Sequence, residues 1–193
     1  MTDKIININN NKTAAAGLRI GEISRTALFA SLLAVCSQIA IPLPMIPVNL
    51  GLLAVYYAGL LLKGKEALLS VCLFLLMGAV GVPVFAGFRG GPAVLFDKTG
   101  GYLLGYLATV AIVSLLRPWA ATFWKKSLAC FLGMICCYAL GTAWFMYLTG
   151  LSLPVSLSYC VIPFLPGDTA KILLAAGSTP RLLSAIRSTR MGN

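Results

Sequence analysis

The chain has 193 residues, of which 59% are hydrophobic and only 10% are charged, and its formal net charge is +10. Soluble globular domains carry about a quarter charged residues, so this composition excludes a soluble enzyme or binding domain and indicates an integral membrane protein. The basic residues stand at the ends of apolar segments rather than in one patch, which argues against nucleic-acid binding.

A membrane-spanning helix needs about 20 apolar residues, so the chain has room for about six spans and for no separate soluble domain. Residues 1–17 are polar and rich in asparagine, and we expect them to form a disordered cytoplasmic tail. Residues 18–193 are expected to form one all-α membrane domain of six transmembrane helices, with a broken or re-entrant segment before the last helix. The predicted spans are 23–41, 48–62, 67–84, 101–116, 127–148 and 167–186.

Small residues form one face of the first predicted span. Ala30 and Ala34 are separated by one helical turn, a spacing that lets two helix backbones approach closely in lipid. This face could contact a partner subunit, or it could pack against another helix of the same chain. The spacing alone does not distinguish these two interpretations.

Glycines and aromatic residues alternate in the connection between the third and fourth spans. This connection contains Phe85, Gly87, Arg89 and, further on, the run Thr99-Gly100-Gly101-Tyr102. Glycines beside aromatic side chains are typical of a loop whose backbone must come close to a ligand or to another segment. The fourth span then begins with a second close-packing spacing, Gly101-x-x-x-Gly105.

The segment from Pro163 to Lys171 places two opposite charges inside apolar sequence. An Asp or Lys within a membrane costs about 3 kcal/mol on insertion scales, so such residues usually pair, face a cavity or bind a solute. Pro163 and Pro166 each lack a backbone donor and restrict the preceding residue, which predicts an interruption followed by a helix start. Asp168 and Lys171 are three residues apart and would share one face of that helix.

The distribution of basic residues predicts the orientation of the chain. Apart from Lys171, only Arg89 and Lys98 stand on one side of the predicted spans, and the other lysines and arginines stand on the opposite side. Positive residues gather on the cytoplasmic side, so both termini are expected in the cytoplasm. The glycine-rich loop and the Asp168 segment would then share the outer side and form one outward-facing pocket.

The residues brought to this pocket suit a small amphipathic molecule. Lys171, Arg89 and a helix N-terminus favour an anionic group such as a carboxylate. Ionised Asp168 can only accept hydrogen bonds, so it suits a neutral group rich in N–H donors, such as an amide or urea. Phe85, Phe88 and Tyr102 would cover the apolar part of the molecule.

A purely structural interpretation of the same charges remains open. Asp168 could cap the last helix, and Lys171 could neutralise it across one turn. The six cysteines lie in apolar sequence without C-x-x-C spacing and are interpreted as small buried hydrophobes. The sequence contains no histidine, so we expect no metal site and no histidine-based catalysis.

Three motifs in this order resemble the BioY family of biotin transporters: Gly81-Val82-Pro83-Val84-Phe85-Ala86-Gly87-Phe88 with Gly90-Gly91, Thr99-Gly100-Gly101-Tyr102, and Pro163-Phe164-Leu165-Pro166-Gly167-Asp168-x-x-Lys171. Ala27-Leu28-Phe29-Ala30 in the first span adds to the resemblance, which covers nearly the whole chain after the tail. The family's usual Thr-Leu-Gln near the second span is Asn49-Leu50-Gly51 here, and Asp97-Lys98 replace its usual Gly-Pro before Thr99.

The resemblance implies the substrate-binding S component of an energy-coupling-factor (ECF) transporter in the bacterial cytoplasmic membrane. Such a protein binds biotin from outside with high affinity, takes part in its uptake, and often works with a transmembrane coupling subunit and paired ATPases. It implies no catalysis by this chain and no cofactor, since biotin is the transported ligand. Asp168 and Lys171 would contact biotin, and Ala30 and Ala34 would face the coupling subunit.

Several alternatives stay open at this point. Either Lys171 or Arg89 could bind the carboxylate of biotin, and the chain could transport alone, as a homo-oligomer or with a coupling complex. An uptake component for a different small vitamin, or an intramembrane enzyme that uses Asp168 as acid or base, would share part of the pattern. The enzyme would need a second catalytic group, for which Asp97 is the available carboxylate.

Overall fold

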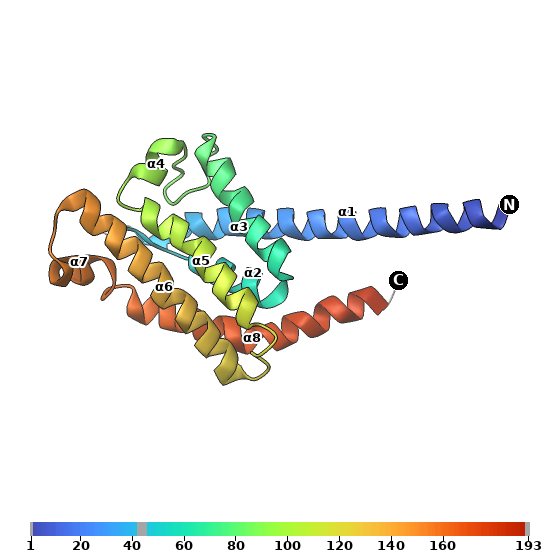
Figure 1. Ribbon diagram of the computed structural model, residues 1–193. Helices are drawn as coiled ribbons and strands as arrows, with labels where there is room; N and C mark the ends of the chain where they lie inside the picture. Colours follow the sequence, from blue (N-terminus) through green and yellow to red (C-terminus); the bar gives the residue numbers. More distant parts are fainter. Residues whose placement is uncertain (1, 42–45, 192–193) are drawn as a thin grey trace.

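The computed structural model describes residues 2–41 and 46–191, and it describes side chains within 20–41 and 46–184. Helices form a bundle in which the two ends of the chain lie on the same side, while α4 and α7 lie at the other end (Figure 1). The elements are α1 (Thr2–Gln38), β1 (Ala40–Ile41), β2 (Val48–Asn49), α2 (Gly51–Leu61), α3 (Gly64–Ala79), α4 (Pro92–Phe96), α5 (Gly100–Leu116), α6 (Phe123–Thr149), α7 (Leu153–Cys160) and α8 (Leu165–Met191).

Two described stretches, Ile20–Gln38 and Phe123–Thr149, are long and apolar enough to cross a membrane. Helices α7 and α8 satisfy the same criterion together, although the chain bends by 54° between them. Helices α2 and α5 are apolar but shorter. The structure therefore confirms a mostly helical chain with a broken segment before the last helix.

A two-stranded antiparallel ribbon is the one described departure from the all-α expectation. β1 pairs with β2 in the register Ala40 with Asn49 and Ile41 with Val48. The ribbon closes the proline-rich connection after α1, whose residues 42–45 lie outside the described part of the chain. Because of this pairing, Asn49 lies close to the end of α1, which matters for the site below.

Helix α5 packs against α2, α3 and α6, and glycines permit the close approach to α6. A Cβ atom on Gly101 would lie 2.3 Å from Cβ of Trp144, and one on Gly105 would lie 2.8 Å from Sγ of Cys137. The predicted close-packing role of Gly101-x-x-x-Gly105 is therefore confirmed, since any larger side chain would force these helices apart.

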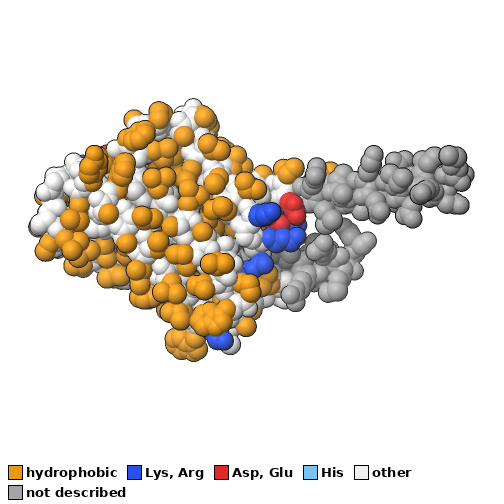
Figure 2. Space-filling model, viewed as in Figure 1, with side chains coloured by type: hydrophobic (Ala, Val, Ile, Leu, Met, Phe, Trp, Pro, Cys, Tyr) orange, Lys and Arg blue, Asp and Glu red, His pale blue; other side chains and the backbone are white. Residues whose placement is uncertain are grey.

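A charged cluster marks the end of the bundle nearer the termini (Figure 2). Arg25 on α1 binds the carboxylate of Glu66 on α3 through two hydrogen bonds of 2.9 and 3.0 Å, and Glu66 is only 4% exposed. Lys63 Nζ lies 3.6 Å from Oε1 of Glu22, which lies on helix α1 like Arg25. Helix α3 begins at Gly64 and turns Glu66 inward, where Arg25 compensates its charge.

Helix α1 uses part of its small-residue face inside the chain. Ala30 is 1% exposed and Ala34 is half-buried against the core, whereas Ala27 and Ser31 on the adjoining face are exposed. Ala30 thus packs within the chain, and its expected contact with a partner stays a prediction. The disordered tail expected at 1–17 also stays a prediction. Helix α1 begins at Thr2, but the side chains before Ile20 lie outside the described residues.

Candidate functional site

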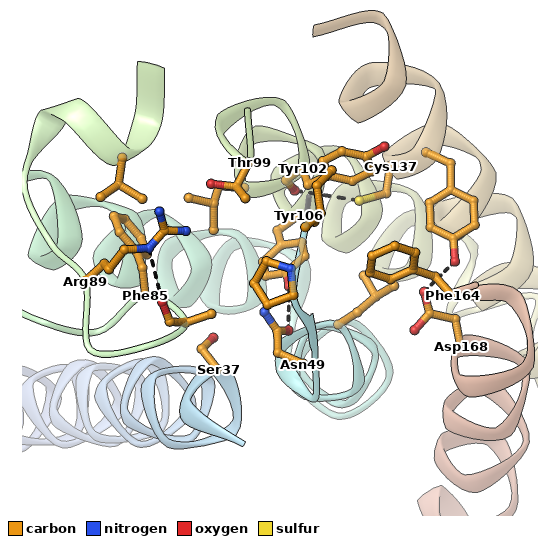
Figure 3. Close-up of a pocket in the computed structure, with 17 residues that line it drawn as sticks. Ser37, Asn49, Phe85, Arg89, Thr99, Tyr102, Tyr106, Cys137, Phe164 and Asp168 are labelled. Atoms are coloured by element: carbon orange, nitrogen blue, oxygen red, sulfur yellow. Dashed lines mark hydrogen bonds between the residues drawn. The ribbon is translucent and has the colours of Figure 1, made fainter. Parts of the chain in front are cut away.

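A cavity lies at the end of the bundle that carries α4, between the end of α1, the ribbon, the loop 80–91 and helices α5, α6 and α8 (Figure 3). Its empty volume is about 680 Å³ including the open mouth, of which about 70 Å³ is accessible to the centre of a water molecule. A single water needs about 10–15 Å³ by that measure, so the cavity has room for more than one. Its polar lining consists of Ser37, Asn49, Arg89, Thr99, Tyr102, Tyr106, Cys137, Tyr138 and Asp168.

Asp168 and Lys171 form a buried ion pair at one end of this cavity. Lys171 Nζ lies 2.6 Å from Asp168 Oδ1, and the two side chains are 8% and 4% exposed. Tyr138 on α6 donates a 2.5 Å hydrogen bond to Asp168 Oδ2, and Lys171 also donates to the backbone carbonyl of Asn49 at 2.5 Å. The predicted pair therefore exists, and it ties α8 to α6 and to β2.

The start of α8 explains how Asp168 reaches the cavity. The helix begins at Leu165, two residues before the predicted start. Pro166 fits in its first turn because the backbone N–H groups of that turn have no intrahelical acceptor, so the missing N–H of proline costs no hydrogen bond. The backbone N–H of Asp168 already donates to the carbonyl of Phe164 at 2.9 Å. Asp168 is therefore inside the helix rather than its N-cap, and its carboxylate is free to bind Tyr138 and Lys171.

Arg89 lies at the other end of the cavity (Figure 3). Its loop folds back as Phe85 and Arg89 exchange two backbone hydrogen bonds, of 3.0 and 3.2 Å, around positive φ angles at Gly87 (74°) and Phe88 (56°). The Arg89 guanidinium is 3.2 Å from Asp97 Oδ2, and both side chains are more than 40% exposed. The Arg89 guanidinium is solvated, so a ligand anion can replace Asp97 as its partner, whereas Lys171 is buried with Asp168.

Gln38, at the end of α1, holds this loop in place. Its side-chain amide donates to the carbonyls of Pro83 and Phe85 and accepts from the backbone N–H of Phe88, at 3.3, 3.2 and 2.9 Å. Phe85 itself is 1% exposed and covers Gly78, where a Cβ atom would lie 2.0 Å from its ring. The loop therefore contributes a fixed aromatic wall.

The structure does not place every predicted site residue on the cavity surface. Asp168, Arg89, Phe85 and Tyr102 line it, and Lys171 reaches it only through Asp168 and Asn49. The three predicted glycines stand outside the lining: Gly87 forms the loop turn, Gly100 packs beneath the backbone of Leu95, and Gly101 packs on Trp144. Phe88, also expected in the lining, is 73% exposed and does not line the cavity.

Sequence reasoning missed much of the polar wall. The sequence pattern around Tyr138 is that of a core or interface aromatic, yet its hydroxyl donates a hydrogen bond directly to Asp168. Asn49 accepts hydrogen bonds from Gly51 N at 2.9 Å and from the Tyr106 hydroxyl at 3.1 Å. Uncharged polar residues within apolar segments are common in packed helices, so only the departure from the usual family motif at 49–51 drew attention to this wall.

The arrangement offers a carboxylate at one end, a guanidinium at the other and aromatic rings between them. It can bind an uncharged N–H donor and an anion that belong to one elongated, mostly apolar molecule. Within the described residues, no group of three His, Cys, Asp or Glu side chains is placed to hold a metal ion.

Comparisons with known proteins show the family to which the chain belongs. A family model described as "BioY family" matches residues 9–188. "Biotin transporter BioY2" of Lactococcus lactis subsp. cremoris is 32% identical over 89% of this chain and 94% of its own, and "Biotin transporter BioY" of Thermotoga maritima is 33% identical over 80% and 91%. A crystal structure at 2.1 Å of "the S-component for biotin from an ECF-type ABC transporter" shares the fold, with a TM-score of 0.79, 24% identity and coverage of 86% of this chain and 92% of that one. The chain therefore belongs to the BioY family.

Proposed function

We propose that this membrane protein binds biotin from outside the cell with high affinity and serves its uptake, without catalysing a reaction. The observation that carries this proposal is the cavity with Asp168 at one end and Arg89 at the other. Biotin combines a ureido group with two N–H donors, an apolar thioether ring and a carboxylate on a flexible chain. The relatives compared above are named as biotin transporters, which favours this ligand over another vitamin and over an intramembrane enzyme.

The position of the two cations indicates how biotin lies in the cavity. Lys171 is already bound to Asp168 and to the Asn49 carbonyl, and a third charged partner would have to enter a buried site. Arg89 is nearly half exposed at the opposite end, and among the described residues its one ion-pair partner is solvated Asp97. We therefore assign the carboxylate of biotin to Arg89 and the ureido N–H groups to Asp168, with Lys171 holding the Asp168 carboxylate in position.

The chain is proposed to span the cytoplasmic membrane six times, through α1, α2, α3, α5, α6 and α8, with both termini in the cytoplasm. The charged cluster of Arg25, Lys63 and Glu66 lies toward the end that carries the termini, and the cavity lies at the other. This polarity and the excess of basic residues beside the termini support the orientation.

The sequence contains no phosphate-binding G-x-x-x-x-G-K-[ST] motif, so any ATP hydrolysis that drives uptake would come from partner subunits. We propose a transmembrane coupling subunit and ATPase subunits as partners. The exposed side of α1, with Ala27 and Ser31, offers a surface of small residues on which a partner helix could pack, next to Ala30 and Ala34.

The direct test is a calorimetric titration of the purified protein in detergent with biotin, followed by competition with thiamine and riboflavin. We expect submicromolar binding of biotin and no displacement by the other vitamins. Absence of biotin binding, or displacement by either competitor, would refute the ligand assignment. Co-purification of a tagged copy from its native membrane tests the partners separately.

A further inference from the structure

Ser37 is a buried hydroxyl that lines the cavity and has no protein partner. Its side chain belongs to a residue that is 2% exposed, and Oγ makes no hydrogen bond within the described part of the chain. Most buried hydroxyls bind a neighbouring group, because an unpaired one costs about 1–3 kcal/mol. Ser37 stands at the end of α1 and points into the cavity (Figure 3), so a ligand atom can complete its hydrogen bond.

Asn49 lies next to Ser37 on the same wall. Ser37 Oγ and Asn49 Oδ1 both lie 2.9 Å from the point where a Cβ atom on residue 51 would stand, a space that Gly51 leaves open. The oxygen of the Asn49 carboxamide is used by Gly51 and Tyr106. Its amide nitrogen makes no hydrogen bond to another described residue, so two donors, one hydroxyl and one amide, face the cavity together.

This pair complements the acceptors of the proposed ligand, on which the inference rests. The Asn49 backbone carbonyl is bound to Lys171, and Lys171 is bound to Asp168. Ser37 stands toward the Arg89 end in Figure 3, so the two donors lie along the wall between the two ends of the cavity. The carboxylate of biotin is assigned to Arg89 at the far end. The remaining oxygen of biotin is the ureido carbonyl, an uncharged acceptor flanked by the N–H groups that Asp168 accepts.

We propose that Ser37 and Asn49 are binding residues that donate hydrogen bonds to the ureido carbonyl oxygen. They would set the specificity of this chain for a urea, because an analogue without that oxygen leaves the buried Ser37 hydroxyl and the half-buried Asn49 amide without an acceptor. Gly51 contributes by leaving room for the two side chains above its Cα atom.

The test compares biotin with 2′-thiobiotin, in which a weakly accepting sulfur replaces the ureido oxygen. Dissociation constants of both are measured by calorimetry for the wild-type protein, Ser37→Ala and Asn49→Asp. Asn49→Asp retains the oxygen that Gly51 and Tyr106 use, removes the N–H donors and adds a negative charge, so its effect is read from the ratio of the two dissociation constants and not from either one alone. We expect the wild type to prefer biotin by about 3- to 10-fold per lost hydrogen bond, and each variant to lose most of its share of that preference.

Thr99→Val provides the matched control. Thr99 also lines the cavity with an unpartnered buried hydroxyl, but it stands on the connection that carries Asp97, the partner of Arg89. This variant is expected to keep the full preference for biotin over thiobiotin. If Ser37→Ala and Asn49→Asp weaken both ligands equally, the carbonyl contact is refuted while biotin binding stands. If the wild-type protein binds neither ligand, the proposed function itself fails.

Discussion

The charges of Asp168 and Lys171 support both the stability of the fold and the binding of biotin, and a set of three variants separates these two roles. Both side chains are more than nine-tenths buried and their charged atoms are 2.6 Å apart. Removing one partner leaves an uncompensated buried charge, which costs about 3–5 kcal/mol, whereas replacing both by neutral groups of similar volume is often neutral. Asp168→Asn and Lys171→Met should therefore each lower the unfolding temperature in detergent, and the double variant should recover most of the loss.

Biotin binding should not recover in the double variant. A hydrogen bond to a charged group contributes about 1.5–3 kcal/mol, so loss of the Asp168 carboxylate should raise the dissociation constant about 10- to 150-fold. Thermal unfolding followed by tryptophan fluorescence gives the stability, and calorimetry gives the affinity. A double variant that binds biotin as tightly as the wild type would show that the pair only supports the fold, and the reasoning would be refuted.

Three further predictions concern the opposite end of the cavity. Arg89→Gln should weaken biotin binding about 10-fold and leave the methyl ester of biotin unaffected in the same calorimetric titration, because the ester carries no charge; equal losses for both ligands would contradict this. Gln38→Leu should release the loop 82–91, seen as faster amide hydrogen exchange there and faster biotin dissociation, with unchanged helical circular dichroism. Gly78→Ala should displace Phe85 and cost about 1–3 kcal/mol of stability, measured as a lower unfolding temperature, whereas Gly167→Ala has open space and should be silent.

The helices could be predicted from hydropathy because lipid requires long apolar segments with satisfied backbone groups. The ends were less certain: α2 spans only Gly51–Leu61, shorter than its predicted 48–62, because Val48 and Asn49 pair with β1 instead of entering the helix. Sequence spacing cannot show this, since strand pairing depends on the fold of residues on both sides of the turn.

The charged part of the site was accessible from sequence and the neutral part was not. Asp168, Lys171 and Arg89 stand out because a charge inside apolar sequence is costly and needs a partner or a ligand. Tyr138 and Ser37 carry no such cost when they pack within a bundle, so their positions on the cavity follow only from the way α6 and α1 are turned. The choice between Arg89 and Lys171 for the carboxylate likewise required the observed partners of both.

Gly100 and Gly101 illustrate the converse case. Their motif predicts a backbone that comes close to a ligand or to another segment, and in the structure both glycines allow helix α5 to approach Leu95 and Trp144. A glycine in a sequence indicates that another group approaches the backbone closely, but it does not show whether that group is a ligand or a neighbouring helix.

A crystal structure of this protein with bound biotin tests the account most directly. It should show a ureido nitrogen within hydrogen-bond distance of the Asp168 carboxylate and the biotin carboxylate directed toward Arg89. Biotin bound outside this cavity, or in the reverse direction with its carboxylate at Lys171, would contradict the account.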